Sequence, residues 1–418
     1  MSERRFSAYE ETTNANSEFM NSEVIIAQNC RYSLNDIKSR INNNSLIVGG
    51  SGTGKTSTVV APNIEQAVGS YIVSDPKGNL YKRYRRYLEK RGYDVYNIDF
   101  IHPERSTHYN PLNYIHTTQD IISIASTLIN EGEDGYTRND PFWDNMAIIL
   151  LSSIIGYMVE TEYTPFNFSG ILRLVREGER ADEDSKLSHL SARFKLLDRD
   201  SWARNHFTDA NQAPYKTYDC IRATLVSKFS TLDTKELQCM MDGNDFTFES
   251  IGEKKTAIFV TVSDTDRSMD CLANIFFTQA MQQLCKFADE KHDSRLPVPV
   301  RFILDDFATN CRIDEFPRMI SSIRSRGISV MLLIQSESQL AKGYGDDKMT
   351  IKANCDTYMY LGGNDYSTAE SVAMMCNKPV SQILYMPIGS CWVFRRGSKP
   401  VFAETLVPGE RKIIEKCG

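Results

Sequence analysis

The chain has 418 residues, of which 41% are hydrophobic and 24% charged, a balance typical of globular proteins rather than disordered ones. Its 48 Lys and Arg against 54 Asp and Glu give a net charge of −6, which excludes a uniformly basic coat for nucleic acid but allows a locally basic channel. The 10 cysteines include no C-x-x-C pair, so neither a zinc site nor a disulfide framework is expected. At about 150 residues per domain, this length predicts two or three domains.

The first part of the chain changes from a polar segment to an α/β pattern. Residues 1–30 are polar, carry no secretory signal and predict a mobile or extended arm. Strand-like and helix-like segments then alternate: Ser45–Val48, Thr56–Val68, Ser70–Ser74, Leu80–Lys90 and Asp94–Phe100. This alternation predicts a parallel sheet with helices on its faces.

Residues 115–235 predict an inserted all-helical domain, because their apolar residues recur near a 3.6 period and convincing strands disappear. The expected helices are Asp120–Asn130, Trp143–Glu160, Phe168–Glu177, Leu187–Leu197 and Tyr218–Thr231. The longest apolar run, Ala147–Val159, is shorter than the ~20 residues of a bilayer span and predicts a buried helix. We therefore expect a cytoplasmic chain without a membrane span.

The α/β pattern resumes beyond the helical block. Strands are expected at Thr256–Ser263, Val300–Leu304, Ile328–Ile334 and Thr357–Leu361, with helices at Met269–Asp289 and near Glu315–Arg324. The predicted nucleotide-binding domain therefore comprises residues 31–114 and 236–418, split by the helical insertion.

A complete phosphate-binding motif follows the first of these strands. It fits G-x-x-x-x-G-K-[ST] and consists of Gly49, Gly50, Ser51, Gly52, Thr53, Gly54, Lys55 and Thr56. Glycines let backbone amides surround phosphate oxygens, and the following helix adds a favourable dipole. We expect Lys55 to reach the β- and γ-phosphates and the Thr56 hydroxyl to bind Mg²⁺.

Two acidic residues, Asp305 and Asp306, directly follow the apolar strand expected at Val300–Leu304. They therefore lie at the edge where open α/β sheets bind ligands. Asp305 is expected to hold the Mg²⁺ and Asp306 to polarise the attacking water. Gln335 ends the next strand, where it would either sense the γ-phosphate or simply cap the strand. Arg324 and Arg326 precede that strand, and either would act as an arginine finger on a neighbouring subunit or as a surface ion-pair residue.

Two further segments are site candidates. The loop Asp75–Gly78 follows a predicted parallel strand, and the basic segment Lys82–Arg91 carries interleaved tyrosines. The basic segment would either grip nucleic-acid phosphates or form a solvated helix face. The chain lacks the N-K-x-D motif of a GTPase, since Asn377-Lys378 is followed by Pro379-Val380, and this favours ATP.

Together these motifs resemble the type IV coupling proteins, the ATPases of conjugation and type IV secretion that are related to ring-shaped DNA translocases. The resemblance covers about residues 40–405 and rests on the order and spacing of its motifs. The motifs are Gly49–Thr56, Asp75–Leu80, Tyr109–Leu112, Phe302–Asp306, Ser325–Ser329, Gln335-Ser336, Tyr344–Asp347, Asn354–Asp356 and Leu361–Asp365.

The resemblance implies a RecA-like P-loop NTPase with an inserted all-α domain that receives the substrate. It implies an ATP- and Mg²⁺-dependent hexamer that links single-stranded DNA bound to a relaxase, or an effector protein, to the secretion channel. Lys55, Thr56 and Asp305 match its nucleotide and metal positions, Arg324 its trans arginine and Gln335 its sensor glutamine.

The chain departs from the family pattern in two respects. Asp306 stands where the family usually has Glu, which shortens the carboxylate by one methylene. Family members usually begin with membrane-spanning helices, so a missing segment or a partner would supply membrane association, and the isolated chain could be a monomer. The alternatives are a nucleotide-switched substrate receptor with little hydrolysis, or a related DNA translocase or packaging ATPase.

Overall fold

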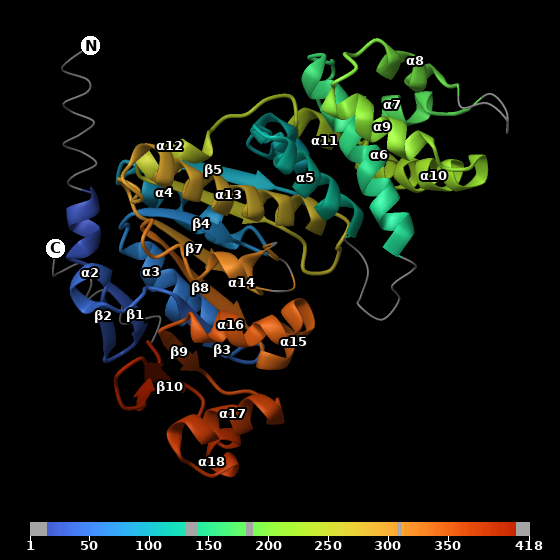
Figure 1. Cartoon of the computed structure of the whole chain (residues 1–418). Coiled ribbons are helices and arrows are strands. Elements are labelled where there is room, and N and C mark those ends of the chain that lie inside the picture. Colours follow the sequence, from blue (N-terminus) through green and yellow to red (C-terminus); the bar gives the residue numbers. More distant parts are fainter. Residues whose placement is uncertain are drawn as a thin grey trace, which may run out of the picture. The chain divides into compact units, whose positions relative to one another are not determined.

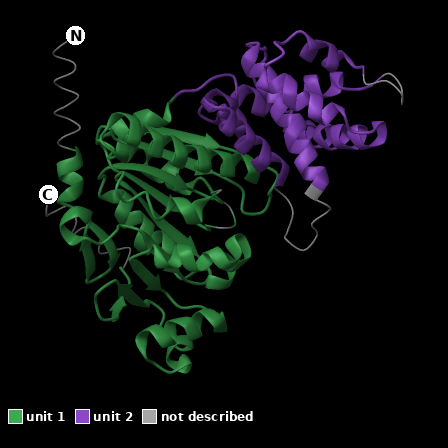
Figure 2. Cartoon of the chain, in the orientation of Figure 1, with its two compact units in different colours: residues 1–101, 246–418 green, residues 102–245 purple. Residues whose placement is uncertain are grey.

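The computed structural model describes residues 15–130, 141–180, 187–307, 309, 311–313 and 315–406. The chain divides into two compact units, one of residues 1–101 and 246–418 and the other of residues 102–245 (Figure 2). The first unit is α/β and the second is helical. The helical unit begins and ends outside the expected limits of 115 and 235, and residues near its start pack within it. Asn110, for example, donates from Nδ2 to the carbonyl of Phe166 at 2.7 Å.

The α/β unit is built on one nine-stranded sheet with the order β11-β10-β9-β3-β8-β7-β4-β6-β5 (Figure 1). The strands are β3 (Ser45–Val48), β4 (Ser70–Ser74), β5 (Asp94–Asp99), β6 (Thr256–Thr261), β7 (Val300–Leu304), β8 (Ile328–Ile334), β9 (Thr357–Tyr360), β10 (Ser390–Arg395) and β11 (Val401–Glu404). The seven neighbouring strands β9, β3, β8, β7, β4, β6 and β5 run parallel to one another. At the other end of the sheet, β10 pairs antiparallel with both β9 and β11. The predicted mostly parallel sheet is confirmed.

Helices cover both faces of this sheet (Figure 1). The helices of the α/β unit include α2 (Asp36–Ser39), α3 (Ala61–Glu65), α4 (Asn79–Glu89), α12 (Phe248–Glu253), α13 (Asp270–Lys291), α14 (Phe316–Met319), α15 (Glu337–Tyr344), α16 (Lys348–Ala353), α17 (Tyr366–Cys376) and α18 (Val380–Leu384). On one face, Ile64 of α3 and Leu88 of α4 share a buried cluster with Val73 of β4. On the other, Phe246 links the ring of Tyr96 in β5 to that of Phe276 in α13.

The prediction of a polar arm over residues 1–30 is wrong for its second half. Residues 15–20 are helical, and β1 (Glu23–Ala27) pairs with β2 (Cys30–Ser33) in a short hairpin. Four of the five β1 residues are buried, and Asn63 of α3 anchors the strand by bonding the backbone of Ile25 through both ends of its amide. Residues 1–14 lie outside the described part of the chain.

The helical unit contains α5 (Thr118–Asn130), α6 (Pro141–Glu160), α7 (Phe168–Glu177), α8 (His189–Lys195), α9 (Trp202–Asn211), α10 (Tyr215–Leu232) and α11 (Lys235–Met240). Its core is aromatic and aliphatic, and the rings of Phe194 and Phe207 stack with centroids 4.1 Å apart. The amphipathic periodicity therefore located most of these helices correctly, although α9 and α11 were missed.

Helix α6 is longer than the apolar run in the sequence indicated. Its segment Phe142–Glu160, with a mean hydropathy of 1.5, is long and apolar enough to cross a membrane by length and composition alone. The expectation that this region is too short for a span is therefore wrong. More than half of the segment (56%) is buried inside the structure, and α6 packs against α5 and α9, as the core helix of a globular unit would.

Candidate nucleotide-binding site

The phosphate-binding loop joins β3 to a π-helical turn over Thr56–Val60 that leads into α3. Gly52 and Gly54 have φ values of 77° and 86°, a region that favours glycine. A Cβ at Gly49 would lie 2.7 Å from Thr53 Oγ1 and 2.8 Å from Leu361 Cβ, closer than packing allows. The loop therefore needs its glycines for close backbone approach, which is the shape that lets amides surround a phosphate.

The Lys55 side chain curls back over this loop. Its ammonium donates to the carbonyl oxygens of Gly49 at 2.6 Å and Gly50 at 3.3 Å, and the residue is only 9% exposed. Burial lowers the pKa of Lys55, and the nearby carboxylates of Asp305 and Asp306 oppose that shift. Among the described residues the Lys55 ammonium bonds carbonyl oxygens alone, so it is poised to exchange them for an anionic phosphate, which would compensate its charge.

Thr56 and Asp305 meet at the carboxyl edge of the sheet although 249 positions separate them. The Thr56 hydroxyl donates to Oδ2 of Asp305 at 2.7 Å. Asp305 is 8% exposed, and burial raises its pKa, opposed by the Thr56 hydrogen bond. A hydroxyl and a carboxylate are the hard oxygen ligands that Mg²⁺ takes, usually with waters and substrate phosphates, so this pair fits the ion.

Asp306 and Gln335 form a second pair beside the first. Asp306 has a φ of 50°, which Asp tolerates better than most residues, and its Oδ1 accepts from Gln335 Nε2 at 3.3 Å. The backbone amide of Gln335 donates to Oε1 of Gln339 at 2.9 Å. Because β7 and β8 are parallel neighbours, residues that follow both strands reach the same edge.

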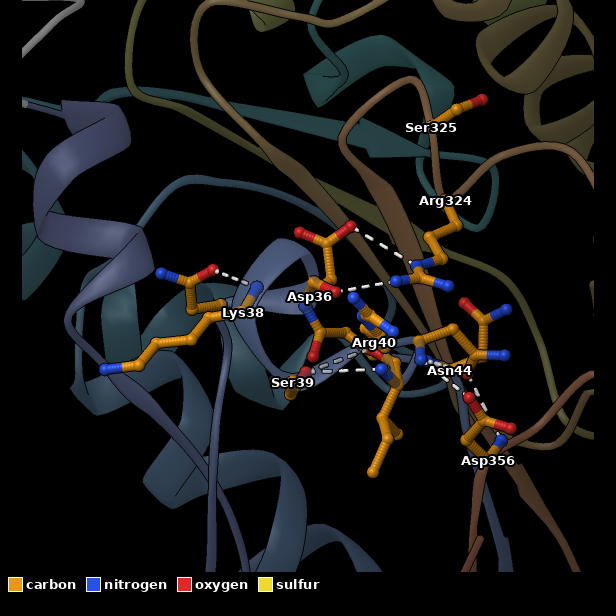
Figure 3. Close-up of polar contacts among 12 residues, drawn as sticks. Asp36, Lys38, Ser39, Arg40, Asn44, Arg324, Ser325 and Asp356 are labelled. Carbon is orange, nitrogen blue, oxygen red and sulfur yellow. Dashed lines mark hydrogen bonds and ion pairs between the residues drawn. The ribbon is translucent and has the colours of Figure 1, made fainter.

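Arg324 and Arg326 are the predicted site residues that the structure does not bring to this edge. They precede β8, whose seven residues span roughly 23 Å, so they lie at the opposite edge of the sheet from the phosphate-binding loop. The Arg324 guanidinium donates to the backbone oxygen of Asp36 at 2.6 Å and pairs with the Asp36 carboxylate at 3.5 Å (Figure 3). Arg295 pairs with the same carboxylate at 2.8 Å. Neither Arg324 nor Arg326 therefore acts on the nucleotide site of its own chain.

The loop Asp75–Gly78 has a structural role in this conformation. The buried Asp75 carboxylate accepts from the backbone amides of Asn79 at 3.1 Å and Tyr81 at 2.9 Å, and so caps α4. Burial raises the pKa of Asp75, opposed by these hydrogen bonds. Both carboxylate oxygens of Asp75 therefore already accept hydrogen bonds from the first turn of α4.

The basic segment Lys82–Arg91 forms a solvated helix face on α4 and the turn that follows. Arg85 pairs with Glu89 at 2.8 Å, and Tyr84 donates to Glu65 at 2.8 Å. Arg91 lies over the ring of Tyr87, with its guanidinium carbon 3.7 Å from the ring centroid. Tyr84 and Tyr87 thus both contact residues of this protein. This favours the hypothesis of a solvated helix face over that of a surface on which nucleic-acid bases stack.

Sequence reasoning did not assign roles to several residues that support this site. The carbonyl of Gly362, after β9, accepts from the Gly50 amide at 2.9 Å, and a Cβ at Gly363 would lie 3.4 Å from that amide nitrogen. Ser74 donates to the Asp305 carbonyl at 3.2 Å. Two consecutive glycines directly after a strand often mark a place where two backbone segments approach closely. The pair Gly362-Gly363 is therefore the sequence signal that could have predicted this contact with the phosphate-binding loop.

Comparison with known proteins identifies sequence relatives over most of the chain. A family model described as type IV secretory system conjugative DNA transfer matches residues 8–378. A probable conjugal transfer protein TraG of Sinorhizobium fredii (strain NBRC 101917 / NGR234) is 22% identical over 348 residues, covering 81% of this chain and 53% of that protein. The protein VirD4 of Agrobacterium fabrum (strain C58 / ATCC 33970) is 24% identical over 340 residues, covering 78% and 48%. The chain thus spans about half the length of the curated relatives it matches.

Solved structures share the fold. The plasmid coupling protein TrwB in complex with the non-hydrolysable ATP analogue ADPNP gives a TM-score of 0.67 at 14% identity, covering 94% of this chain and 91% of that one. TrwB in complex with ADP and Mg²⁺ gives 0.66 at 15% identity, with the same coverage. Since the family model matches most of the chain and the fold is that of a RecA-like P-loop NTPase, the protein belongs to the type IV secretory system conjugative DNA transfer family.

Proposed function

We propose that this protein is an ATP-hydrolysing coupling protein, which recruits a relaxase–DNA or protein substrate and drives its transfer through a type IV secretion or conjugation channel. One observation carries the proposal. Thr56 and Asp305 hydrogen-bond at 2.7 Å beside the buried Lys55, at the edge where the phosphate-binding loop curls. The TrwB structures with ADPNP and with ADP and Mg²⁺ support ATP and Mg²⁺ as the ligands.

Each residue at this edge has a distinct task in the proposed reaction. The loop amides and Lys55 bind and orient the phosphates, while Thr56 and Asp305 hold the Mg²⁺, which would stabilise charge on the phosphate oxygens. Asp306 and Gln335 position the attacking water, since their side chains already contact each other at this edge. Arg324 would complete the site of a neighbouring subunit, which is consistent with its distance from its own loop.

The proposed assembly is a homo-hexamer that works at the cytoplasmic face of the inner membrane, attached through a further segment or a partner. Single-stranded DNA, a relaxase or effector protein, and components of the secretion channel are the proposed partners. The relatives named for conjugal transfer and the matching family model support these partners.

Steady-state hydrolysis tests the proposal. We expect Mg²⁺-dependent ATP turnover that single-stranded DNA stimulates and that Lys55→Ala abolishes, because the substitution removes the cation that curls over the loop. Lys216→Ala, which removes an exposed lysine of the helical unit, is the matched control and should leave turnover unchanged. No binding at millimolar ATP would refute the nucleotide site.

A nucleotide-switched receptor is the second candidate, because Asp306 is one methylene shorter than the Glu that the family usually has at this position. ATP binding with negligible turnover, together with nucleotide-dependent binding of a protein partner, would replace motor activity with this function.

A further inference from the structure

A closed ring of hydrogen bonds includes the pair Asp306 and Gln335, and two residues without an assigned role complete it. Oδ1 of Asp306 accepts from Gln335 Nε2 at 3.3 Å, and the backbone amide of Gln335 donates to Oε1 of Gln339 at 2.9 Å. Gln339 Nε2 donates to Thr309 Oγ1 at 3.3 Å, and that hydroxyl donates to the Asp306 carbonyl at 2.7 Å. The ring thus joins the loop after β7 to the first turn of α15.

Donors and acceptors match at each link of this ring, which fixes how its groups are oriented. The Gln335 backbone amide can only donate, so the oxygen of the Gln339 side chain must face it and the NH₂ group must face Thr309. The Thr309 hydroxyl gives its one hydrogen to the Asp306 carbonyl and accepts from Gln339 with a lone pair. A carboxylate at position 339, or a methyl group in place of the Thr309 hydroxyl, would therefore break the ring.

The ring also holds Asp306 in a backbone conformation that few residues adopt. The φ of 50° at Asp306 lies in the left-handed region. The Asp306 carbonyl accepts both from the backbone amide of Thr309, at 3.1 Å, and from the Thr309 hydroxyl, at 2.7 Å. Such a conformation persists where the surrounding bonds fix it, so Thr309 and the glutamine that bonds it help to decide where the Asp306 carboxylate points.

The pair that the ring holds together presents two further oxygen atoms. Asp306 Oδ2 and Gln335 Oε1 accept no hydrogen bond from the residues that the structure describes. A water molecule that attacks a phosphate can donate two hydrogens, and these two oxygens, which belong to bonded groups, can accept one each. How the two oxygens lie relative to each other depends on the contact between Asp306 and Gln335, which the ring maintains.

The position of Gln339 also has a purely structural use, as part of a helix cap. Gln339 is the third residue of α15, after the N-cap Ser336, where a glutamine often bonds the backbone amide of the N-cap residue itself. Here the side chain bonds the amide of Gln335 instead, one residue earlier, and its other end reaches Thr309. A cap does not require that second bond, so the two roles can be separated by substitution.

We propose that Gln339 is a positioning residue that, together with Thr309, holds Asp306 and Gln335 in the arrangement that orients the attacking water. The inference rests on the proposed function, since that function gives Asp306 and Gln335 their task. Gln339 then affects the reacting state of the nucleotide and leaves ground-state binding unchanged, because the bonds of the ring involve none of the residues 49–56.

Single-turnover ATP hydrolysis and trapping by tetrafluoroaluminate, both with the full chain, test the proposal. With ADP and Mg²⁺, tetrafluoroaluminate imitates the phosphoryl group in the reacting state, so its affinity reports on the site without turnover. Gln339→Glu keeps an oxygen for the Gln335 amide and for the helix cap, but it loses the NH₂ group that bonds Thr309. We expect this variant and the isosteric Thr309→Val to lower the hydrolysis rate and the affinity for the trapped complex about 10-fold, with ADP affinity unchanged.

Three control variants separate positioning from folding and from added charge. Thr309→Ser retains the hydroxyl and should keep the wild-type rate. Gln382→Glu adds the same charge at an exposed position in the first turn of α18 and should also match the wild type. In a Gln335→Ala background the ring is already open, so Gln339→Glu should lower the rate less than about 3-fold further.

The outcomes distinguish this inference from the proposed function. Wild-type hydrolysis and trapping in Gln339→Glu, an equal loss of affinity for ADP and for the trapped complex, or a fully additive loss in the double variant would each overturn the inference alone. Nucleotide binding without turnover in the wild type would refute the motor function, while trapping would still measure the effect of Gln339. A wild-type chain that binds no nucleotide would overturn both.

Discussion

Asp305→Asn should separate the stability of the apo protein from its affinity for Mg²⁺-ATP. The buried Asp305 carboxylate lies close enough to Asp306 for repulsion to raise its pKa further, after burial itself. Asparagine retains an oxygen that can accept the 2.7 Å bond from Thr56, and it removes the charge. Removing a poorly compensated buried charge typically stabilises a protein by about 1–2 kcal/mol. For a unit of this size we expect the apo melting temperature to rise by about 2–8 °C.

The same substitution should remove the stabilisation that nucleotide gives. At 100 times its dissociation constant, Mg²⁺-ATP stabilises a protein by about 2.7 kcal/mol, and a neutral amide at position 305 is a much weaker metal ligand than the carboxylate. Thermal unfolding monitored by circular dichroism, with and without Mg²⁺-ATP, measures both effects. Asp209→Asn, at an exposed position of the helical unit, is the control for loss of one negative charge.

The dependence on pH follows from the raised pKa of Asp305. The folded-state pKa of Asp305 lies above the ordinary 3.8, so the native state holds the proton more tightly than the unfolded state does. The wild-type protein therefore loses stability as pH rises from about 3.8 through the folded-state pKa, where the buried carboxylate becomes charged. The stability gained by Asp305→Asn should be constant at neutral pH and vanish as pH falls below about 3.8. An apo melting temperature below that of the wild type, or an undiminished Mg²⁺-ATP shift, would refute this reasoning.

Three further substitutions test other parts of the structure. Gln335→Ala should lower kcat for ATP about 10- to 100-fold with little change in KM, because its side chain meets Asp306 and not the phosphate-binding loop. Asp36→Asn should destabilise the fold by about 2–4 kcal/mol, since it leaves two half-buried guanidinium groups without their shared carboxylate. Arg301→Met should leave stability unchanged or raise it by up to about 2 kcal/mol, because Arg301 is buried and its Nη1 has no partner among the described residues.

The outcomes that would contradict these expectations are distinct. For Gln335, a rise in KM with unchanged kcat would place the side chain in binding rather than in the chemical step. For Asp36, an unfolding midpoint in urea equal to that of the wild type would show that the carboxylate contributes nothing. For Arg301, a loss of more than about 2 kcal/mol would mean that its hydrogen bond to Asn63 Oδ1 at 3.2 Å outweighs the cost of burying the charge.

The nucleotide site was predictable to the extent that each of its parts is a short contiguous pattern. The glycines and Lys55 occupy one eight-residue motif, and Asp305 and Gln335 each end an apolar strand. Parallel strands place their carboxyl ends at one edge, so the meeting of Thr56 and Asp305 follows from strand order. Strand order does not predict the 2.7 Å hydrogen bond between the Thr56 hydroxyl and Asp305 Oδ2, which only the structure shows.

Other parts of the fold depended on contacts that a local pattern cannot show. The apolar segment of β1 (Glu23–Ala27) lies beside an Asn- and Ser-rich stretch and was interpreted as part of an arm, yet Asn63 fixes its backbone. The antiparallel pair β10–β11 was missed because half of the six β10 residues are only partly buried and all four β11 residues are partly or fully exposed, so neither strand is a fully buried apolar run. Propensity carries little information for strands whose stability comes from pairing.

The sequence alone located the parts of the candidate nucleotide site, because a phosphate-binding loop, a strand ending in Asp305 and a long helical insertion are each encoded by neighbouring residues. Only the tertiary structure showed which residues that are distant in the sequence contact one another. It places Arg324 at the far edge of the sheet on Asp36, 288 positions away, and joins Gln339 to Thr309, 30 positions away. The physical reason is that hydrogen bonds and ion pairs depend on distance in space, whereas a motif records only distance along the chain.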